Sequence, residues 1–198
     1  MSKKIVIVDD EPITRMDIRE MLEEAGYDVV GEASDGFDAI EVCKKQLPNI
    51  VIMDIKMPLL DGINASKIVI QEELADGIIL LSAYSDINFI EKAKKAGVIG
   101  YLVKPLDHKS LIPAIEVALA KSLELKETKE NLIKTQKKLE GRKVIEKAKG
   151  ILMNQQNITE EEAFSSLRNL SMKKRVPIEE ISKIIIMGKG DVFNYNDN

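Results

Sequence analysis

The first 107 residues of this 198-residue chain alternate between short apolar runs and stretches with helical spacing. The runs are rich in Ile, Val and Leu and lack polar alternation, which is typical of strands buried on both faces of a sheet. Because strands that alternate with helices form parallel sheets, the pattern predicts an α/β fold with a five-stranded, doubly wound parallel sheet. The predicted strands contain residues 5–8, 29–30, 50–53, 78–81 and 100–103.

Apolar residues at helical spacing mark the segments between these strands. Five apolar residues mark the first segment. They are Ile13, Met16, Ile18, Met21 and Leu22. Cys43, the single cysteine, lies on the apolar side of the next helical segment and is expected in the core.

A different pattern begins after Lys104-Pro105. Strong helix formers dominate residues 108–140, which contain no glycine and one proline, so one long helix is predicted. Every seventh residue of one stripe is apolar, but the partner stripe is mostly polar, which gives a partial coiled coil. This pattern fits either a weak, regulated dimer seam or a solvated connecting helix. The apolar stripe consists of Leu111, Ala118, Leu125, Leu132 and Leu139.

Gly141 is expected to end the long helix, and three shorter helices are predicted after it. The second begins with a capping box formed by Thr159 and Glu162, and the third begins at Pro177. The chain therefore divides into an α/β domain, a helical linker, an all-α three-helix domain and a flexible tail. The predicted boundaries are residues 1–120, 108–141, 142–187 and 188–198.

The two predicted domains carry opposite charge. Residues 1–107 contain 12 basic and 20 acidic residues, a net charge of −8, whereas residues 142–190 contain 10 and 6, a net charge of +4. This asymmetry indicates different partners for the two domains. Aromatic residues make up 4% of the chain, which argues against nucleic-acid binding by base stacking on an aromatic platform.

The numbers of cysteine and histidine residues and the hydropathy of the chain exclude disulfide-linked proteins, proteins with Cys- or His-rich metal sites, and membrane-spanning proteins. With one Cys and one His, the chain has neither an intramolecular disulfide nor a Cys- or His-rich metal site. No apolar run approaches the roughly 20 residues that a membrane-spanning helix needs. We therefore expect a soluble, cytoplasmic protein that does not contact a membrane.

Polar side chains follow four of the predicted strands where each strand ends. Asp9 and Asp10 follow the first strand, Asp54 the third, Ser82 the fourth and Lys104 the fifth. Because parallel strands end at the same edge, these side chains should meet where open α/β sheets bind ligands. Crowded carboxylates favour Mg²⁺, and Lys and Ser suit a phosphate, so Asp54 is the predicted nucleophile for a phosphoryl group.

These residues resemble the motifs of response-regulator receiver domains. The matching elements are Asp9-Asp10, Asp54 with Met57-Pro58 and Asp61-Gly62, Ser82-Ala83, and Lys104-Pro105. The resemblance implies a flavodoxin-like fold with strand order 2-1-3-4-5 and a cis Lys104-Pro105 bond. It also implies that a sensor histidine kinase supplies the phosphoryl group that the domain takes up. The protein would therefore not be an enzyme with a separate catalytic output.

The same resemblance implies roles for individual residues. Asp54 would be the phosphoacceptor, Ser82 and Lys104 would contact the phosphoryl group, and Tyr101 would be the aromatic switch residue. The ligands of Mg²⁺ would be Asp9, Asp10, Asp54 and the backbone carbonyl of Lys56.

The C-terminal domain has clustered basic charge and lacks the residue types of a catalytic site. No His, Cys or glycine-rich phosphate loop follows residue 141, so an enzymatic output is not expected. Clustered Lys and Arg suit a nucleic-acid backbone, although such clusters also occur as solvated faces. The basic residues expected at this interface are Arg142, Lys143, Lys147, Lys149, Arg168, Lys173, Lys174 and Arg175.

Three segments here resemble the ANTAR domain, the RNA-binding output module of AmiR/NasR-type antiterminators. They are residues 142–153, which include Ala148-Lys149-Gly150-Ile151-Leu152-Met153, and residues 159–168 and 171–176. The resemblance implies binding to paired hairpins in nascent leader transcripts, which prevents terminator formation. Gly150 is included in the expected RNA site, because a helical glycine costs about 1 kcal/mol and suggests close approach of RNA or another helix.

Together the resemblances predict a phosphorylation-controlled antiterminator, with a layout similar to that of ethanolamine-utilisation antiterminators. Phosphorylation of Asp54 would favour a homodimer, formed along the receiver face or along the apolar stripe of residues 111–139, that presents two RNA-binding units to two hairpins. A receiver-controlled DNA-binding transcription factor is an alternative, although residues 170–177 exceed the turn of a helix-turn-helix motif. A protein-docking module is another alternative.

Overall fold

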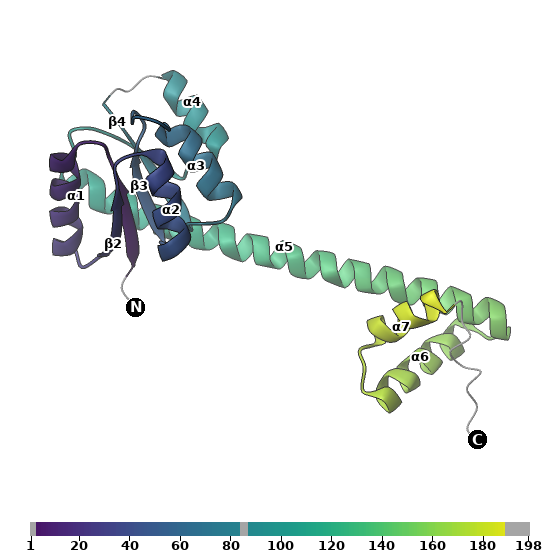
Figure 1. Ribbon diagram of the computed structural model, residues 1–198. Coiled ribbons are helices and arrows are strands. Elements are labelled where there is room, and N and C mark those ends of the chain that lie inside the picture. Colours follow the sequence, from purple (N-terminus) through teal and green to yellow (C-terminus); the bar gives the residue numbers. More distant parts are fainter. Residues whose placement is uncertain (1–2, 84–86, 189–198) are drawn as a thin grey trace. The chain divides into compact units, whose positions relative to one another are not determined.

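The computed structural model describes residues 3–83 and 87–188, and residues 189–198 of the predicted tail lie outside this description. The N-terminal half is built around a parallel sheet with the strand order β2-β1-β3-β4-β5, which confirms the predicted fold (Figure 1). The pairing of β1 with β2 shifts register between Ile5 and Val6. The strands are β1 (Lys4–Val8), β2 (Asp28–Ala33), β3 (Ile50–Asp54), β4 (Gly77–Ser82) and β5 (Gly100–Val103).

Helices follow each strand, and further helices complete the C-terminal half. The helix α2 begins where Asp35 caps it by accepting hydrogen bonds from the backbone N–H groups of Phe37 and Asp38. The helices are α1 (Pro12–Glu24), α2 (Gly36–Gln46), α3 (Gly62–Gln71), α4 (Ile87–Ala96), α5 (His108–Gln156), α6 (Glu160–Lys174) and α7 (Ile178–Met187).

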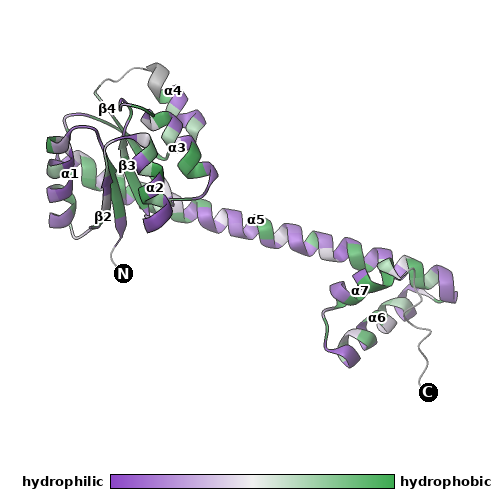
Figure 2. Ribbon diagram, viewed as in Figure 1, coloured by the Kyte–Doolittle hydropathy of each residue, from purple (hydrophilic) through white to green (hydrophobic). Residues whose placement is uncertain are grey.

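The sheet has a hydrophobic core on each face, because successive residues of a strand point in opposite directions. Ile52 of β3 packs in the core covered by α1 and α5, whereas its neighbour Met53 packs in the core covered by α2, α3 and α4. Cys43 is buried in the second core, as predicted. Figure 2 shows the strands as predominantly hydrophobic and the outer helix surfaces as predominantly hydrophilic.

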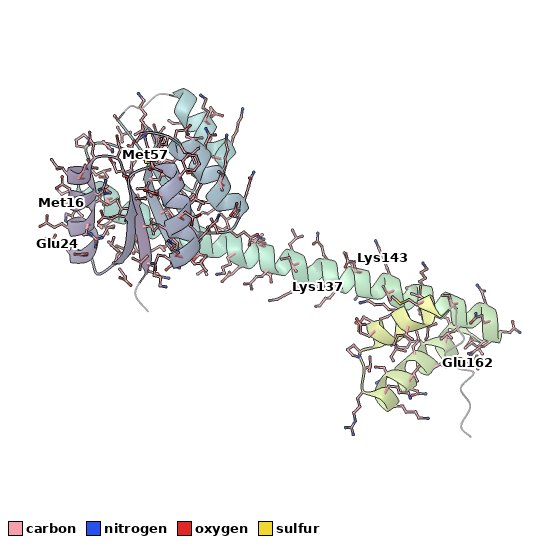
Figure 3. The ribbon with its side chains drawn as sticks, viewed as in Figure 1. Met16, Glu24, Met57, Lys137, Lys143 and Glu162 are labelled. Atoms are coloured by element: carbon pink, nitrogen blue, oxygen red, sulfur yellow. The ribbon has the colours of Figure 1, made fainter. Side chains whose placement is uncertain are left out.

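Two of the five apolar residues that mark α1 by their helical spacing do not lie in the core. Ile13 is 74% exposed and Met16 is 69% exposed, whereas Ile18 and Leu22 are buried. Figure 3 shows Met16 on the outer side of α1. At 3.6 residues per turn, Ile13 lies about 140° around the helix from Ile18, so the apolar set is wider than the buried face.

The long helix does not end at Gly141, contrary to the sequence prediction. Strong helix formers on both sides carry α5 through the glycine, whose cost in a helix is only about 1 kcal/mol. A Cβ on Gly141 would lie 3.0 Å from Cγ of Glu179, so the glycine allows α7 to pack closely. The predicted first helix of the C-terminal domain is therefore the last part of α5.

The chain divides into two compact units, residues 1–128 and 129–198. The heptad stripe of α5 is correspondingly divided between different environments. Leu111 and Ala118 are buried in the core of the first unit. Leu125, Leu132 and Leu139 are each about half exposed, and Figure 2 shows hydrophilic residues dominating this part of α5.

The second unit is a small helical bundle. The capping box of α6 is present as predicted, since Thr159 and Glu162 exchange hydrogen bonds between side chain and backbone. The end of α5 packs with α6 and α7 through a core that consists of Ala148, Leu152, Ala163, Leu167, Ile181 and Ile185. In the part of the chain that the structure describes, no helix is both long and apolar enough to span a membrane.

Candidate functional site

The carboxyl ends of β1 and β3 bring two buried aspartates together around one lysine. Asp9 follows β1 and is completely buried, and Asp54 ends β3 and is 5% exposed. Nζ of Lys104, which follows β5, lies 2.6 Å from Oδ2 of Asp9 and 2.7 Å from Oδ1 of Asp54. The parallel sheet thus brings three of the predicted site residues into direct contact.

Burial and the hydrogen bonds between these residues act in opposite directions on the pKa values of Asp54 and Lys104. Burial raises the pKa of Asp54 above its ordinary value, and the nearby Lys104 ammonium opposes this shift without cancelling it. Burial lowers the pKa of Lys104, but its hydrogen bonds to Asp54 and Asp9 outweigh this effect and leave the pKa raised. Lys104 therefore remains charged and acts as the counter-ion of both carboxylates.

The backbone that follows Asp54 fixes its carboxylate from one side. The N–H of Lys56 donates a hydrogen bond of 2.7 Å to Oδ2 of Asp54. Gly62, the first residue of α3, lies so close behind that a Cβ there would overlap the carbonyl oxygen of Asp54. Asp61 caps α3 by accepting a hydrogen bond from the backbone N–H of Asn64. The Asp61-Gly62 motif therefore positions the backbone that supports Asp54.

A cavity of about 300 Å³ opens beside Asp54, and we call it the phosphate cavity. It is large enough for a phosphoryl group with surrounding water. Asp10, unlike its neighbour Asp9, is exposed. The residues that line the phosphate cavity are Asp10, Glu11, Asp54, Ile55, Lys56, Ser82, Ala83 and Lys104.

The donors at the phosphate cavity suit a hydrated magnesium ion. Carboxylate oxygens of Asp10 and Asp54 belong to its lining, and Mg²⁺ usually takes one or two carboxylates while keeping several waters. Across residues 3–83 and 87–188, no three His, Cys, Asp or Glu side chains form a metal-binding cluster. The donor set therefore fits Mg²⁺ better than a metal that needs an all-protein cage.

The predicted switch residues lie on the two strands beyond Asp54. Ser82 ends β4, is buried and lines the phosphate cavity, and its carbonyl oxygen accepts a 2.8 Å hydrogen bond from the N–H of Lys104. Tyr101 of β5 is half-buried, pairs in register with Leu80, and packs against the core under α2, α3 and α4. The Lys104-Pro105 bond is cis, as predicted.

Arg15 is a site residue that the sequence analysis missed. Its Nη1 donates a 2.6 Å hydrogen bond to the carbonyl oxygen of Asp9, and its Nε donates a 3.0 Å bond to Glu32. Burial raises the pKa of Glu32, but the hydrogen bonds from Arg19 and Arg15 outweigh this and leave it lowered. Position 15 carries no distinctive motif, so no signal in the sequence marks this arginine as a site residue.

Most of the predicted nucleic-acid contacts are exposed. On α5 these are Arg142, Lys143 and Lys147, and Figure 3 shows Lys143 extending outward from the helix. Arg175 ends α6 with a left-handed backbone (φ 55°). The exposed basic residues of α6 and its C-terminus are Arg168, Lys173, Lys174 and Arg175.

Lys149 does not belong to this exposed set. It is 7% exposed, and its Nζ lies 2.7 Å from Glu146 and 2.6 Å from Glu160. The ammonium also lies 6.0 Å from the centre of the Phe164 ring, within the range of a cation–π contact. Lys149 therefore joins α5 to α6, and its charge is already balanced.

Gly150 has open space around it. A Cβ at this position would meet no atom within 4 Å outside its own helix, so the suggested close approach of another helix does not occur in this chain. Gly150 is half-buried on α5.

Comparison with protein families gives two matches. Residues 5–116 match the response regulator receiver domain, and residues 134–186 match the ANTAR domain. The second match begins before the expected boundary at residue 142, in agreement with the continuity of α5 through Gly141.

Individual relatives cover either the whole chain or its first half. The chain is 38% identical over 184 residues to the transcriptional regulatory protein PdtaR of Mycobacterium tuberculosis. The matched region covers 93% of this chain and 89% of PdtaR. It is 37% identical over 115 residues to the chemotaxis protein CheY of Thermotoga maritima. This match covers 58% of this chain and 96% of CheY. A LuxR-family response regulator structure from Aurantimonas sp. SI85-9A1 has 36% identity and a TM-score of 0.57, and covers 61% of this chain and 87% of that one.

Proposed function

The chain belongs to the response regulators that join a receiver domain to an ANTAR domain, and from this premise we propose how its residues carry out that function. The ANTAR output binds RNA and acts by transcription antitermination, which decides against the DNA-binding alternative. Both matched domains are regulatory, and neither is a catalytic output domain.

Asp54 is the proposed phosphoacceptor. Its carboxylate lies beside the phosphate cavity with Lys104 at 2.7 Å, and this observation carries the assignment. A carboxylate oxygen attacks the phosphorus of a phosphohistidine, the P–N bond breaks, and its electron pair returns to the imidazole nitrogen. Lys104 then balances charge on the phosphoryl oxygens.

The proposed magnesium ligands are Asp9, Asp10, Asp54 and the backbone carbonyl of Lys56. Receiver domains typically use Mg²⁺, which supplies positive charge that stabilises the phosphoryl oxygens. The described residues that line the phosphate cavity supply oxygen donors and include neither cysteine nor methionine, the soft ligands of proteins.

Ser82 and Tyr101 are the proposed relay. The Ser82 hydroxyl donates to the phosphoryl group, and β4 moves with it. Tyr101 pairs with β4 and packs on the α2–α4 core, so it changes its burial when β4 shifts. Phosphorylation would shift the equilibrium between two arrangements of β4 and Tyr101.

The phosphoacceptor assignment is tested on the intact chain with acetyl phosphate and Mg²⁺. Asp54→Asn should abolish the mass increase of one phosphoryl group, whereas Asp38→Asn, at an exposed carboxylate of α2, should retain it. Phosphorylation of the Asp54→Asn variant at the wild-type rate would contradict the assignment.

A sensor histidine kinase is the proposed phosphoryl donor, and we assign its docking to the exposed apolar residues of α1. Ile13 and Met16 lie within two turns of Asp9, at the end of the sheet where the phosphohistidine must arrive. Replacing both with Asp should slow transfer from the kinase about tenfold or more, since apolar anchors dominate such interfaces. Uptake from acetyl phosphate should not change, and a parallel loss with both donors would contradict docking.

RNA hairpins of nascent leader transcripts are the proposed ligand of the exposed basic residues and Gly150. Phosphorylation is proposed to favour a homodimer through Leu125, Leu132 and Leu139, which are half exposed and spaced seven apart. Sedimentation with and without phosphorylation measures this step, and an equal dimer fraction in both states would contradict it.

The regulated transcript is found by crosslinking to cellular RNA and sequencing the bound leaders. An ethanolamine-utilisation leader is one proposed target, because the order of receiver, long helix and ANTAR domain is similar to that of the ethanolamine-utilisation antiterminator. Nascent transcripts as targets also support a cytoplasmic location. Absence of this leader from the bound fraction would exclude that target and leave the search open to others.

A further inference from the structure

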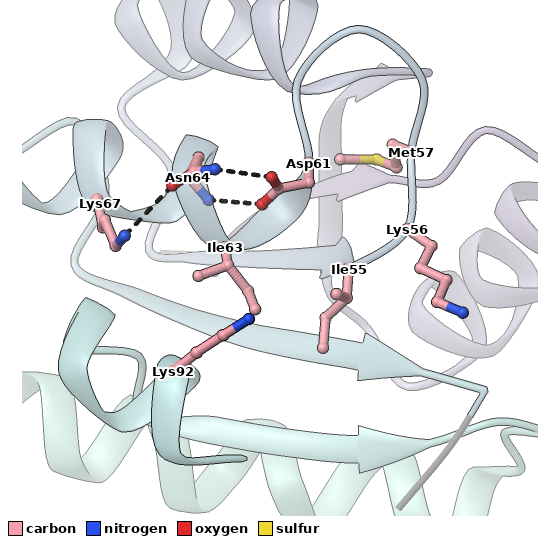
Figure 4. Close-up of a pocket in the computed structure, with 8 residues that line it drawn as sticks. All are labelled: Ile55, Lys56, Met57, Asp61, Ile63, Asn64, Lys67 and Lys92. Carbon is pink, nitrogen blue, oxygen red and sulfur yellow. Dashed lines mark hydrogen bonds between the residues drawn. The ribbon is translucent and has the colours of Figure 1, made fainter. Parts of the chain in front are cut away.

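A second and larger hollow lies in the receiver, next to the phosphate cavity. Its volume is about 720 Å³, within the range of small-molecule sites. Figure 4 shows it between the loop after β3, the start of α3, and α4. We call it the lysine pocket, and its lining residues are Ile55, Lys56, Met57, Asp61, Ile63, Asn64, Lys67 and Lys92.

The lysine pocket combines an apolar wall with positive charge. Ile55 and Ile63 are almost completely buried and form part of the wall. Lys56, Lys67 and Lys92 come from the β3–α3 loop, α3 and α4, so three separate segments contribute a lysine to the lining. This concentration is notable in a segment with a net charge of −8 over residues 1–107.

The one carboxylate of the pocket is already engaged. Oδ1 of Asp61 accepts a hydrogen bond from the N–H of Asn64, and Oδ2 accepts one from Nδ2 of the same residue. Lys67 donates a 3.2 Å hydrogen bond to Oδ1 of Asn64 and not to Asp61 (Figure 4). The neutral amide therefore separates the carboxylate from this ammonium, which keeps its positive charge available to an incoming anion.

The lysine pocket and the phosphate cavity share a wall. Ile55 and Lys56 line both spaces, and the N–H of Lys56 holds the Asp54 carboxylate. A ligand that displaces this wall by a few tenths of an ångström changes the position of the residue next to Asp54. Ligand binding and phosphorylation are then linked, and each changes the other by the same factor.

We propose that the lysine pocket binds a small organic anion, with a carboxylate, phosphate or sulfonate group on an apolar body, and that this binding is coupled to the state of Asp54. The apolar wall accommodates the body, and Lys67 and Lys92 bind the anionic group. The binding itself follows from the pocket, whereas the coupling rests on Asp54 being the phosphoacceptor.

Binding is tested on the full chain with 8-anilinonaphthalene-1-sulfonate and its uncharged analogue N-phenyl-1-naphthylamine. The sulfonate should bind about tenfold more tightly, and amide NMR shifts should concentrate at residues 55–67 and 92. Equal affinity of the two probes would overturn the proposal. Shifts confined to the apolar cavity of the C-terminal unit, lined by Leu170, Lys174, Val176, Ile181 and Ile184, would also overturn it.

Charge-reversed variants provide a second measurement. Lys67→Glu combined with Lys92→Glu should weaken sulfonate binding about tenfold, since two favourable charges become unfavourable. Lys95→Glu, an exposed position on the same helix α4 outside the pocket, is the matched control and should bind as the wild type does. Equal weakening by the control would show a general charge effect and overturn the assignment.

Coupling is measured by repeating the titration with beryllofluoride and Mg²⁺, which mimic the phosphorylated state. The affinity for the sulfonate should change by about fivefold or more. If Asp54 is phosphorylated by acetyl phosphate and the affinity nevertheless stays constant, the coupling is overturned. Failure of phosphorylation itself would instead contradict the proposed phosphoacceptor and leave the binding result unaffected.

Discussion

The receiver and the C-terminal unit use charge in opposite ways. In the receiver, Asp9 and Asp54 are buried and both contact the largely buried Lys104, so each charge is held at a defined position. In the C-terminal unit, residues such as Lys173 and Arg175 are exposed. A buried charge is costly and must be partnered, whereas an exposed charge is hydrated and can exchange partners. The first arrangement suits a phosphate switch and the second suits a polyanion.

The largest expected effect is on stability and concerns Lys104, the counter-ion of the two buried aspartates. Lys104→Ala leaves two buried carboxylates without their counter-ion, so the free energy of unfolding of the receiver should fall by about 3 kcal/mol. Chemical denaturation without divalent ions measures it, and Mg²⁺ should restore part of the loss. Lys45→Ala, at an exposed position of α2, should change stability by less than about 0.5 kcal/mol. Equal effects of the two substitutions would remove the contrast between buried and exposed charge.

The next effect is on RNA affinity and concerns the exposed cluster after α6. Replacing Lys173, Lys174 and Arg175 together with Ala should weaken binding to a hairpin about a hundredfold near physiological salt. The slope of log affinity against log salt should fall in magnitude by about 2–3, while thermal stability stays unchanged. An unchanged salt slope would exclude these residues from the interface.

A smaller effect is expected for Lys149 and Lys147 of α5, whose substitutions should change different properties. Lys149→Gln removes the ion pair with Glu160 that joins α5 to α6, together with the pair to Glu146 within α5, so it should lower the melting temperature of the C-terminal unit. Lys147→Gln, at an exposed position, should instead leave the melting temperature unchanged and reduce the salt slope of RNA binding by about 1. If both variants lose affinity without losing stability, Lys149 is a contact and not a structural residue.

The smallest effect is a pH dependence of the receiver. Burial and a hydrogen bond from the Tyr27 hydroxyl to Glu116 raise the pKa of Tyr27 from 10.0 to about 12. The unfolded chain therefore loses this proton first, so stability is constant below about pH 10 and falls as pH rises towards about 12. Tyrosinate absorbance and denaturation measure it, and Tyr27→Phe should remove this contribution. A Tyr27 that titrates near pH 10 would contradict it.

The same contrast explains what could be predicted from sequence. Asp9, Asp54 and Lys104 follow apolar strands, and parallel topology alone brings strand ends together, so their contact was predictable. Arg15 was missed because its function depends on a backbone carbonyl, which has no signature in the sequence.

Helical residues were harder to predict, because helical spacing does not show where a covered face ends. Ile13 and Met16 have the spacing of core residues and are exposed. Lys149 lies among basic residues and is buried, since its partner Glu160 belongs to the next helix. Gly141 carries a local preference for a break, and the packing of Glu179 against it overrides that preference.

Because Lys104 is the counter-ion of both buried aspartates, the summed charge at this edge of the sheet has a thermodynamic consequence. Asp9, Asp10, Asp54 and Lys104 together carry a net charge of −2 when the carboxylates are ionised and the lysine is protonated. Phosphorylation alone would make this charge about −3, because a phosphorylated aspartate carries about −2 where the carboxylate carried −1. A divalent cation alone would bring the charge to zero, and with both present it is about −1. The metal ion and the phosphoryl group should therefore bind with positive cooperativity, and the lifetime of the phosphorylated receiver should depend on the concentration of free magnesium.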